Sequence, residues 1–121
     1  MGGNQFLILM AAVIGLFVIF RSIKALGRIS PKKALALQES GAAIVDVRKP
    51  SEYSSGHIQG AVNIPLDSIS KIKNKIGKDT DVIVYCLSGA RSGRAARQLK
   101  SLGYKKVHDL GGIGRWPYSK T

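Results

Sequence analysis

An apolar run near the amino terminus constrains this chain more than any other feature. Residues 6–20 are 15 consecutive residues without a polar side chain. The first 20 residues carry no ionisable side chain, so all 26 Lys, Arg, Asp and Glu residues lie in the remaining 101 positions. The chain therefore has two compositionally different parts, and the charged part is long enough for one small domain.

The length and uniformity of this run favour a membrane-spanning helix. A helix over residues 2–20 would be about 28 Å long, close to the roughly 30 Å of a bilayer's hydrocarbon core. A core helix of a small domain is apolar on one face, whereas this segment is apolar all round. The alternative of a cleaved signal peptide lacks its expected flanks, a preceding basic residue and a following small-x-small site. We predict a transmembrane helix and a basic juxtamembrane segment within residues 1–28.

The distribution of charge predicts the orientation of that helix. Arg21, Lys24 and Arg28 follow the apolar run directly, which by the positive-inside rule places the rest of the chain on the cytoplasmic side. Residues 29–121 carry 16 basic and 7 acidic side chains, a net +9 out of the chain's +12. No nucleic-acid-binding motif is present and aromatic residues are few. We expect a membrane partner and no nucleic acid.

Strand and helix signals alternate along residues 29–121. The first predicted helix begins at Ser30-Pro31, which supply an N-cap and a first-turn proline, and each predicted helix ends before a glycine. The predicted helices cover residues 31–40, 66–76 and 91–102, and the predicted strands cover residues 43–47, 61–64, 81–86 and 106–110, with a turn at Gly111-Gly112. This alternation predicts a small α/β domain with a mainly parallel central sheet flanked by helices.

Cys86 is the single cysteine of the chain, and it ends the most apolar predicted strand. A lone cysteine excludes an intrachain disulfide and a zinc site built from several thiolates. In open α/β sheets, ligands bind beyond the carboxyl ends of the strands, where Cys86 falls. The small residues that follow let the backbone curl round the sulfur with its N–H groups inward, which favours an anion and a thiolate.

The alternative for Cys86 is a buried, inert thiol, since free cysteine is commonly buried. The Cys-x-x-Gly-x-Arg-Ser spacing favours a reactive site, because one loop then holds a nucleophile, a glycine for the turn and an arginine for an anion. We predict Cys86 as the catalytic residue. The predicted substrate-binding residues are Leu87, Ser88, Gly89, Ala90, Arg91 and Ser92. Of the further arginines on the following helix, we expect Arg94 to add positive potential and Arg97 to face solvent.

Several short motifs follow one another in a fixed order: Asp46-Val47-Arg48, Glu52-Tyr53, Gly56-His57-Ile58, Gly60-Ala61, Asn63-Ile64-Pro65, the Cys86 loop, and Gly111-Gly112 with Trp116. Over residues 29–116 the chain thereby resembles the rhodanese family of sulfurtransferases. The resemblance implies a rhodanese domain at residues 29–121, in which Cys86 takes a sulfane sulfur as a persulfide. A nucleophilic acceptor, cyanide in vitro or a thiol in the cell, would then remove it.

The length and composition of the loop refine this expectation. Four residues separate Cys86 from Arg91, whereas related and unrelated phosphatases with a Cys-to-Arg loop use five, so the resemblance is to the sulfur-handling form. Many thiosulfate-using members have a basic residue directly after the cysteine. Leu87 occupies that position here, which weakens the case for thiosulfate as the physiological donor. The resemblance still implies a small sulfur-containing anion, thiosulfate-like, as the donor.

Four polar residues outside the Cys86 loop could be taken for a catalytic cluster: Asp46, Arg48, Glu52 and His57. The resemblance implies that they support the site structurally through ion pairs and backbone hydrogen bonds. His57 has no second histidine beside it, so we expect no metal, and no organic cofactor is implied. The alternative function is a noncatalytic sulfur carrier or partner-binding module tethered to the membrane, although such modules commonly lack the cysteine that this chain retains.

Overall fold

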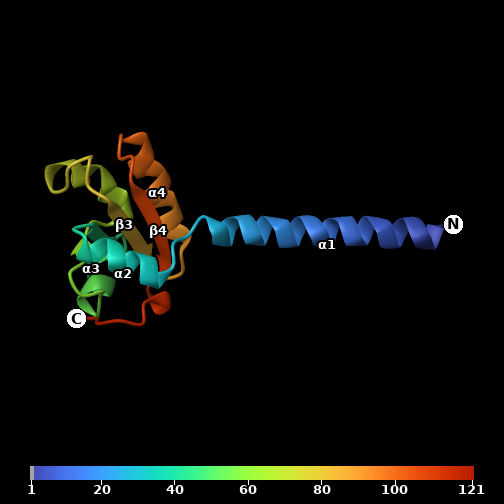
Figure 1. Cartoon of the computed structure of the whole chain (residues 1–121), viewed down its shortest axis with the longest axis horizontal. Coiled ribbons are helices and arrows are strands. Elements are labelled where there is room, and N and C mark those ends of the chain that lie inside the picture. Colours follow the sequence, from blue (N-terminus) through green and yellow to red (C-terminus); the bar gives the residue numbers. More distant parts are fainter. Residues whose placement is uncertain (1) are drawn as a thin grey trace.

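The computed structural model describes residues 2–121, with side chains described for residues 3–18 and 27–121. A long helix, α1 (Gly2–Leu26), extends away from an α/β domain (Figure 1). The helix predicted for the apolar run is therefore present, and it continues to Leu26. Within the part of the chain that is described, no helix combines the length and hydropathy needed to cross a membrane. The transmembrane part of the prediction is not confirmed.

The domain is built on a four-stranded parallel sheet, as the alternation of strands and helices predicts. Its strands are β1 (Ala43–Asp46), β2 (Val62–Asn63), β3 (Val82–Cys86) and β4 (Val107–Gly112), in the order β2-β1-β3-β4. Every residue of β3 is buried, which explains its uninterrupted apolar sequence. Cys86 pairs with Gly112, so the carboxyl ends of β3 and β4 lie side by side.

Two helices lie close to their predicted positions. Helix α2 (Pro31–Glu39) begins at Ser30, whose hydroxyl oxygen accepts a hydrogen bond from the Lys33 N–H at 3.1 Å. Helix α4 (Ala90–Ser101) follows the Cys86 loop and ends just before Gly103. The cap and the glycine stop explain why sequence signals located both helices well.

The predicted α-helix at residues 66–76 is wrong in type. The segment forms a 3₁₀ helix, η1 (Leu66–Asn74), with non-helical dihedral angles at Ser68. Leu66, Ile69 and Ile72 are spaced three residues apart, which is the repeat of a 3₁₀ helix, and Ile69 and Ile72 are buried. The three-residue spacing fits both helix types over so short a segment.

Two further elements differ from the prediction. Helix α3 (Pro50–Ser54) has only five residues and was not predicted. The glycine pair expected to form a turn instead ends strand β4, where a register shift opposite Val84 and Tyr85 coincides with Gly111 at φ +89°. An irregularity of this kind lets a strand accommodate a glycine that would otherwise favour a turn. The short 3₁₀ helix η2 (Ile113–Arg115) follows.

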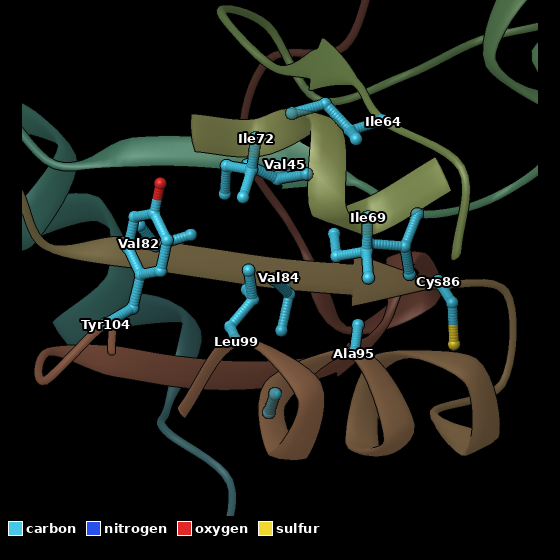
Figure 2. Packing of buried hydrophobic residues seen from close by; sticks show 12 residues of the cluster. Val45, Ile64, Ile69, Ile72, Val82, Val84, Cys86, Ala95, Leu99 and Tyr104 are labelled. Atoms are coloured by element: carbon cyan, nitrogen blue, oxygen red, sulfur yellow. The ribbon is translucent and has the colours of Figure 1, made fainter. Parts of the chain in front are cut away.

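Alternate residues of β3 point to opposite faces of the sheet and belong to two separate cores. One core joins Val82, Val84 and Cys86 to α4 and η1, including Leu99 and Ile69 (Figure 2). The other joins Ile83 and Tyr85 to α2 and to the carboxyl-terminal tail, where Trp116 is buried. Cys86 thus emerges on the α4 side of the sheet, at the end of the strand and next to the start of that helix.

Candidate active site

The Cys86 thiol lies at the carboxyl end of β3 beneath the loop that leads into α4. Its residue is completely buried, and the Gly89 N–H donates a hydrogen bond to Sγ at 2.9 Å. Gly89 has φ +104°, a left-handed conformation that turns the chain back over the sulfur. A backbone N–H held in this position stabilises negative charge on a thiolate sulfur.

The other residues of the loop divide into exposed and internal positions. Leu87, Ser88 and Ala90 are exposed, with Leu87 57% accessible to solvent. Ser92 is buried, and its hydroxyl donates to the Gly89 carbonyl oxygen at 3.1 Å. The Ser92 hydroxyl therefore holds the loop in shape from within, whereas the exposed residues form its outer surface.

Strand β4 supports the loop from the neighbouring position in the sheet. A Cβ atom added to Gly112 would lie 2.6 Å from the Leu87 carbonyl oxygen, closer than any side chain could stand. The glycine pair in the sequence is thus explained by close contact between the end of β4 and the loop. Sequence reasoning found these glycines but assigned them to a turn.

Arg91 and Glu52 form the ion pair nearest the loop. The Arg91 Nη1 and Nη2 atoms lie 2.7 and 3.0 Å from the two carboxylate oxygens of Glu52. The Lys49 N–H also donates to Glu52 at 3.1 Å. These hydrogen bonds, that from Arg91 first, lower the pKa of Glu52 to about 2. The predicted anion-binding residue and the predicted support residue are therefore brought together, and α3 holds α4 through them.

Arg91 also lies within electrostatic range of Cys86. Its pKa is raised first by the hydrogen bonds to Glu52 and in smaller part by the charge of Cys86. Its side chain is 31% exposed, so the guanidinium is partly accessible while fixed by its partner. The arrangement permits Arg91 to attract an anion to the loop without moving.

Asp46 and Arg48 form a buried pair at the end of β1. The shortest contact is 2.7 Å between Arg48 Nη2 and Asp46 Oδ2, and the same nitrogen donates to the Gly56 carbonyl oxygen at 2.7 Å. The hydrogen bonds to Asp46 raise the pKa of Arg48. Burial, and then the neighbouring Asp46 carboxylate, raise the pKa of Tyr85, whose hydroxyl oxygen accepts from the Ile58 N–H at 3.1 Å.

Asn63 completes this support, and sequence reasoning gave it no role beyond the motif. Its side-chain amide donates to the carbonyl oxygens of Asp46 and Arg48 at 2.9 and 3.0 Å. The β2 strand that carries Asn63 has only two residues, so these bonds add to a short ladder. The sequence signal that could have indicated this role is an asparagine at the end of a short predicted strand.

His57 is part of the packing between the 56–58 turn and the carboxyl terminus. Its ring stacks on Tyr53 with centroids 3.7 Å apart, and its Nδ1 lies 2.9 Å from the Tyr53 carbonyl oxygen. Its backbone exchanges two hydrogen bonds with Thr121, at 2.9 and 2.8 Å. Among the described residues, no group of three His, Cys, Asp or Glu side chains is placed to hold a metal ion.

A basic groove of about 580 Å³ lies against the other side of the loop. Ser88, Gly89 and Ala90 form its edge, and four cations line it: Arg28, Arg94, Arg97 and Lys100. Sequence reasoning expected Arg94 beside the site and Arg97 on a solvent-exposed face, and Arg97 is exposed while it lines the groove. Arg28 was treated only as a topology signal. Their convergence depends on the path of the chain between α1 and α2, which no local pattern predicts.

Comparison with known proteins agrees with this geometry. The family model described as Rhodanese-like domain matches residues 30–117. The thiosulfate sulfurtransferase GlpE of Pseudomonas entomophila is 38% identical over 90 residues, covering 74% of this chain and 83% of that protein. The Bacillus subtilis protein YqhL, described as uncharacterized, is 45% identical over 76 residues. The matched region covers 62% of this chain and 60% of YqhL.

A solved structure described as rhodanese with anions from E. coli superimposes with a TM-score of 0.64 at 36% identity. The superposition covers 67% of this chain and 98% of the solved chain. The fold of the α/β domain is therefore shared with a known rhodanese structure, at an identity that reaches beyond fold alone.

Proposed function

The chain belongs to the rhodanese-like domain family, and from that membership we propose that it is a sulfurtransferase that carries sulfane sulfur on Cys86. The observation that carries this proposal is the Gly89 N–H held 2.9 Å from a buried cysteine sulfur at the end of β3. That donor stabilises the Cys86 thiolate, which takes up the sulfur and forms again when the sulfur leaves. Thiosulfate, or a small anion like it, is the proposed donor.

In the first half-reaction the Cys86 thiolate attacks the outer sulfur of thiosulfate. A bond forms between Sγ and that sulfur, the sulfur–sulfur bond of thiosulfate breaks, and its electron pair leaves with sulfite. The Cys86 persulfide keeps one negative charge. Arg91, fixed by Glu52 at 2.7 and 3.0 Å, attracts the dianion and holds the start of α4 in place.

In the second half-reaction a nucleophile removes the outer sulfur. Cyanide forms a carbon–sulfur bond, the bond from Sγ to the outer sulfur breaks, and thiocyanate leaves while Sγ recovers the thiolate. A thiol acceptor reacts in the same way and becomes a persulfide. The two substrates react in separate steps, so ping-pong kinetics are expected.

The test measures sulfur on the protein before it measures turnover. Purified full-length protein is incubated with thiosulfate, and the intact mass is expected to rise by about 32 Da, one sulfur atom, at Cys86. Cyanide should then restore the original mass and release one equivalent of thiocyanate. Absence of the adduct, or thiocyanate formation that persists in Cys86→Ser, would contradict the proposal.

A noncatalytic sulfur carrier is the alternative function, and the same experiment distinguishes it. A carrier would gain the sulfur and release it once, but would not sustain thiocyanate formation with excess thiosulfate and cyanide. Sustained release with parallel double-reciprocal plots supports the enzyme.

We also propose that α1 anchors the chain in a lipid membrane, with the α/β domain on the cytoplasmic side. The 15-residue apolar run and the basic residues that follow it support this proposal. Large apolar side chains of α1 are exposed, including Phe6 at 61%, Ile8 at 68% and Leu16 at 67%. Recovery of the protein from cells without detergent would contradict the anchor. A reporter fused after Thr121 that is active only outside would contradict the orientation.

A further inference from the structure

The basic groove beside the Cys86 loop is large for an inorganic sulfur donor. Its volume of about 580 Å³ falls in the range of pockets that hold organic ligands, roughly 300–1,000 Å³. It lies between α4 and the segment that leads from α1 to α2, with Val107 and Asp109 of β4 between them. A donor such as thiosulfate would fill only a small part of it.

The cations of the groove are not neutralised by ion pairs. The three ion pairs in the described part of the chain join Asp46 to Arg48, Glu52 to Arg91 and Asp81 to His108. Arg94, Arg97 and Lys100 are exposed and follow one another at three-residue spacing along α4, so they share a face of that helix. Such a concentration of unpaired positive charge attracts a ligand with more than one negative charge.

One carboxylate, that of Asp109, also lines the groove. Its Oδ1 atom accepts a hydrogen bond from the Gly111 N–H at 2.9 Å, and its Oδ2 atom would lie 3.7 Å from a Cβ added to Gly93. Four cations against one carboxylate leave the groove strongly positive.

Gly89 connects this groove to the sulfur site. Its N–H donates to Sγ of Cys86, while on the groove side the Arg28 Cζ atom lies 2.8 Å from the position that a Cβ of Gly89 would occupy. Arg28 itself is held in place because its residue bridges to Asp109 as an added edge of the sheet. A ligand in the groove therefore has one end at the backbone that surrounds the reacting sulfur.

We propose that the groove binds the anionic tail of an organic thiol that accepts the sulfur from Cys86, a thiol that carries phosphate groups. The proposal rests on the sulfurtransferase function proposed above and names the class of its acceptor. Leu87 contributes no charge to the loop, so the attraction for this substrate comes from the four groove cations. Phosphate matches arginine because the planar guanidinium can donate two parallel hydrogen bonds.

The transfer needs no additional reactant. The sulfur of the bound thiol attacks the outer sulfur of the Cys86 persulfide, and a new sulfur–sulfur bond forms. The bond from Sγ to the outer sulfur breaks, and its electron pair stays on Sγ as the thiolate. The proton of the acceptor thiol is taken up by the product persulfide or by solvent. One sulfane sulfur moves from one thiol to the other, so no separate oxidant or reductant is needed.

The test compares two thiols that share one reactive arm. Full-length protein loaded with one sulfur is mixed in single turnover with coenzyme A, which carries phosphates, or with pantetheine, which lacks them. The wild type is expected to react at least about tenfold faster with coenzyme A at subsaturating concentration, and added salt should reduce that preference. Arg97→Glu should lower the rate with coenzyme A about tenfold and leave the rate with pantetheine unchanged.

Lys73→Glu is the matched control, because it makes the same charge change at an exposed residue of η1 that does not line the groove. It should leave both rates and the preference as in the wild type. Each variant is first shown to take up one sulfur from thiosulfate, so its fold and its first half-reaction are verified independently of the acceptor.

The outcomes separate the two proposals. If neither the wild type nor any variant gains sulfur, the sulfurtransferase proposal fails, and the groove proposal that rests on it fails with it. If sulfur is gained but the two thiols react equally, or Arg97→Glu and Lys73→Glu behave alike, the groove proposal is overturned. It is also overturned if a cysteine peptide flanked by glutamates, and not coenzyme A, depends on Arg97, because the groove would then accept a polypeptide.

Discussion

Gly89 has two structural roles that no other residue type could combine. Its backbone N–H donates to Sγ of Cys86, and its missing side chain leaves the space that Arg28 fills. The left-handed backbone at φ +104° sets the direction of that N–H. At the scale of single residues, the site therefore depends on where the backbone of one glycine points.

Gly89→Ala should separate this role from ordinary backbone strain. A side chain in the left-handed region costs about 1–2 kcal/mol, and here the added Cβ would also displace Arg28 and the N–H beneath it. We expect sulfur uptake from thiosulfate to fall at least about tenfold, since a displaced donor no longer holds and stabilises the attacking Cys86 thiolate. Uptake is followed by intact mass, and stability by urea denaturation.

Gly41→Ala is the control for that substitution. Gly41 has φ +105°, but a Cβ there would meet no atom within 4 Å. It should lose a similar amount of stability, about 1–2 kcal/mol, and keep its sulfur uptake. Equal loss of uptake in both variants would assign the effect of Gly89→Ala to stability alone.

At the scale of elements, α3 is tied to α4 by one partly exposed ion pair. Arg91 and Glu52 are 39 positions apart in the chain, and their carboxylate and guanidinium meet in two hydrogen bonds. Since α3 has only five residues and none of them is buried, this pair is a main reason for its position.

Glu52→Gln should make this contribution visible as a function of pH. The Glu52 pKa is lowered from its usual 4.5 to about 2, so the carboxylate stabilises the fold above pH 4.5, and that stabilisation is lost as the pH falls towards 2. The wild type should exceed the variant by about 1 kcal/mol at pH 7, a modest amount because both side chains are partly exposed. The difference in free energy of unfolding should shrink to near zero at pH 2, measured by urea denaturation at each pH.

The same element scale separates what the sequence predicts from what it does not. Strand β3 and helix α4 were predictable because a continuous apolar run and a glycine stop are local signals. The type of η1 was not, because three-residue spacing over so few residues fits two helix types. Helix α3 escaped prediction because its five residues are too few to show a hydrophobic repeat, although Pro50 and Glu52 mark its start.

The candidate site shows the same division. Cys86, Gly89 and Arg91 could be proposed from one short motif, since the loop that holds them is contiguous. The pairing of Arg91 with Glu52 and the approach of Arg28 to Gly89 could not, because each joins segments placed together only by the sheet order β2-β1-β3-β4.

At the scale of the whole molecule, the described side chains of α1, those of residues 3–18, belong to neither core. Both clusters of buried apolar residues are drawn from residue 29 onward. The segment that follows α1, by contrast, belongs to the domain, because the Ile29 N–H donates to the Asp109 carbonyl oxygen at 2.9 Å and Ile29 packs against the second core.

A fragment of residues 27–121 should therefore fold and take up sulfur as the full chain does, with its thermal midpoint within a few degrees. A fragment of residues 30–121 loses Arg28 and Ile29, and its midpoint should fall by at least about 5 °C, since about 1 kcal/mol corresponds to 4–8 °C in a domain of this size. Calorimetry of both fragments checks this. Equal midpoints would show that the segment after α1 is not part of the domain.

The complete burial of Cys86 bears on how long a captured sulfur atom lasts. A free persulfide in solution is lost to peroxide and to any passing thiol, because its outer sulfur is accessible on all sides. In the proposed reaction the sulfur is attached to Cys86 at the carboxyl end of a buried strand, under a loop closed by Gly89 and supported by Gly112. We expect that loop to exclude large reagents, so that a captured sulfur is lost slowly and is kept until a matching acceptor arrives.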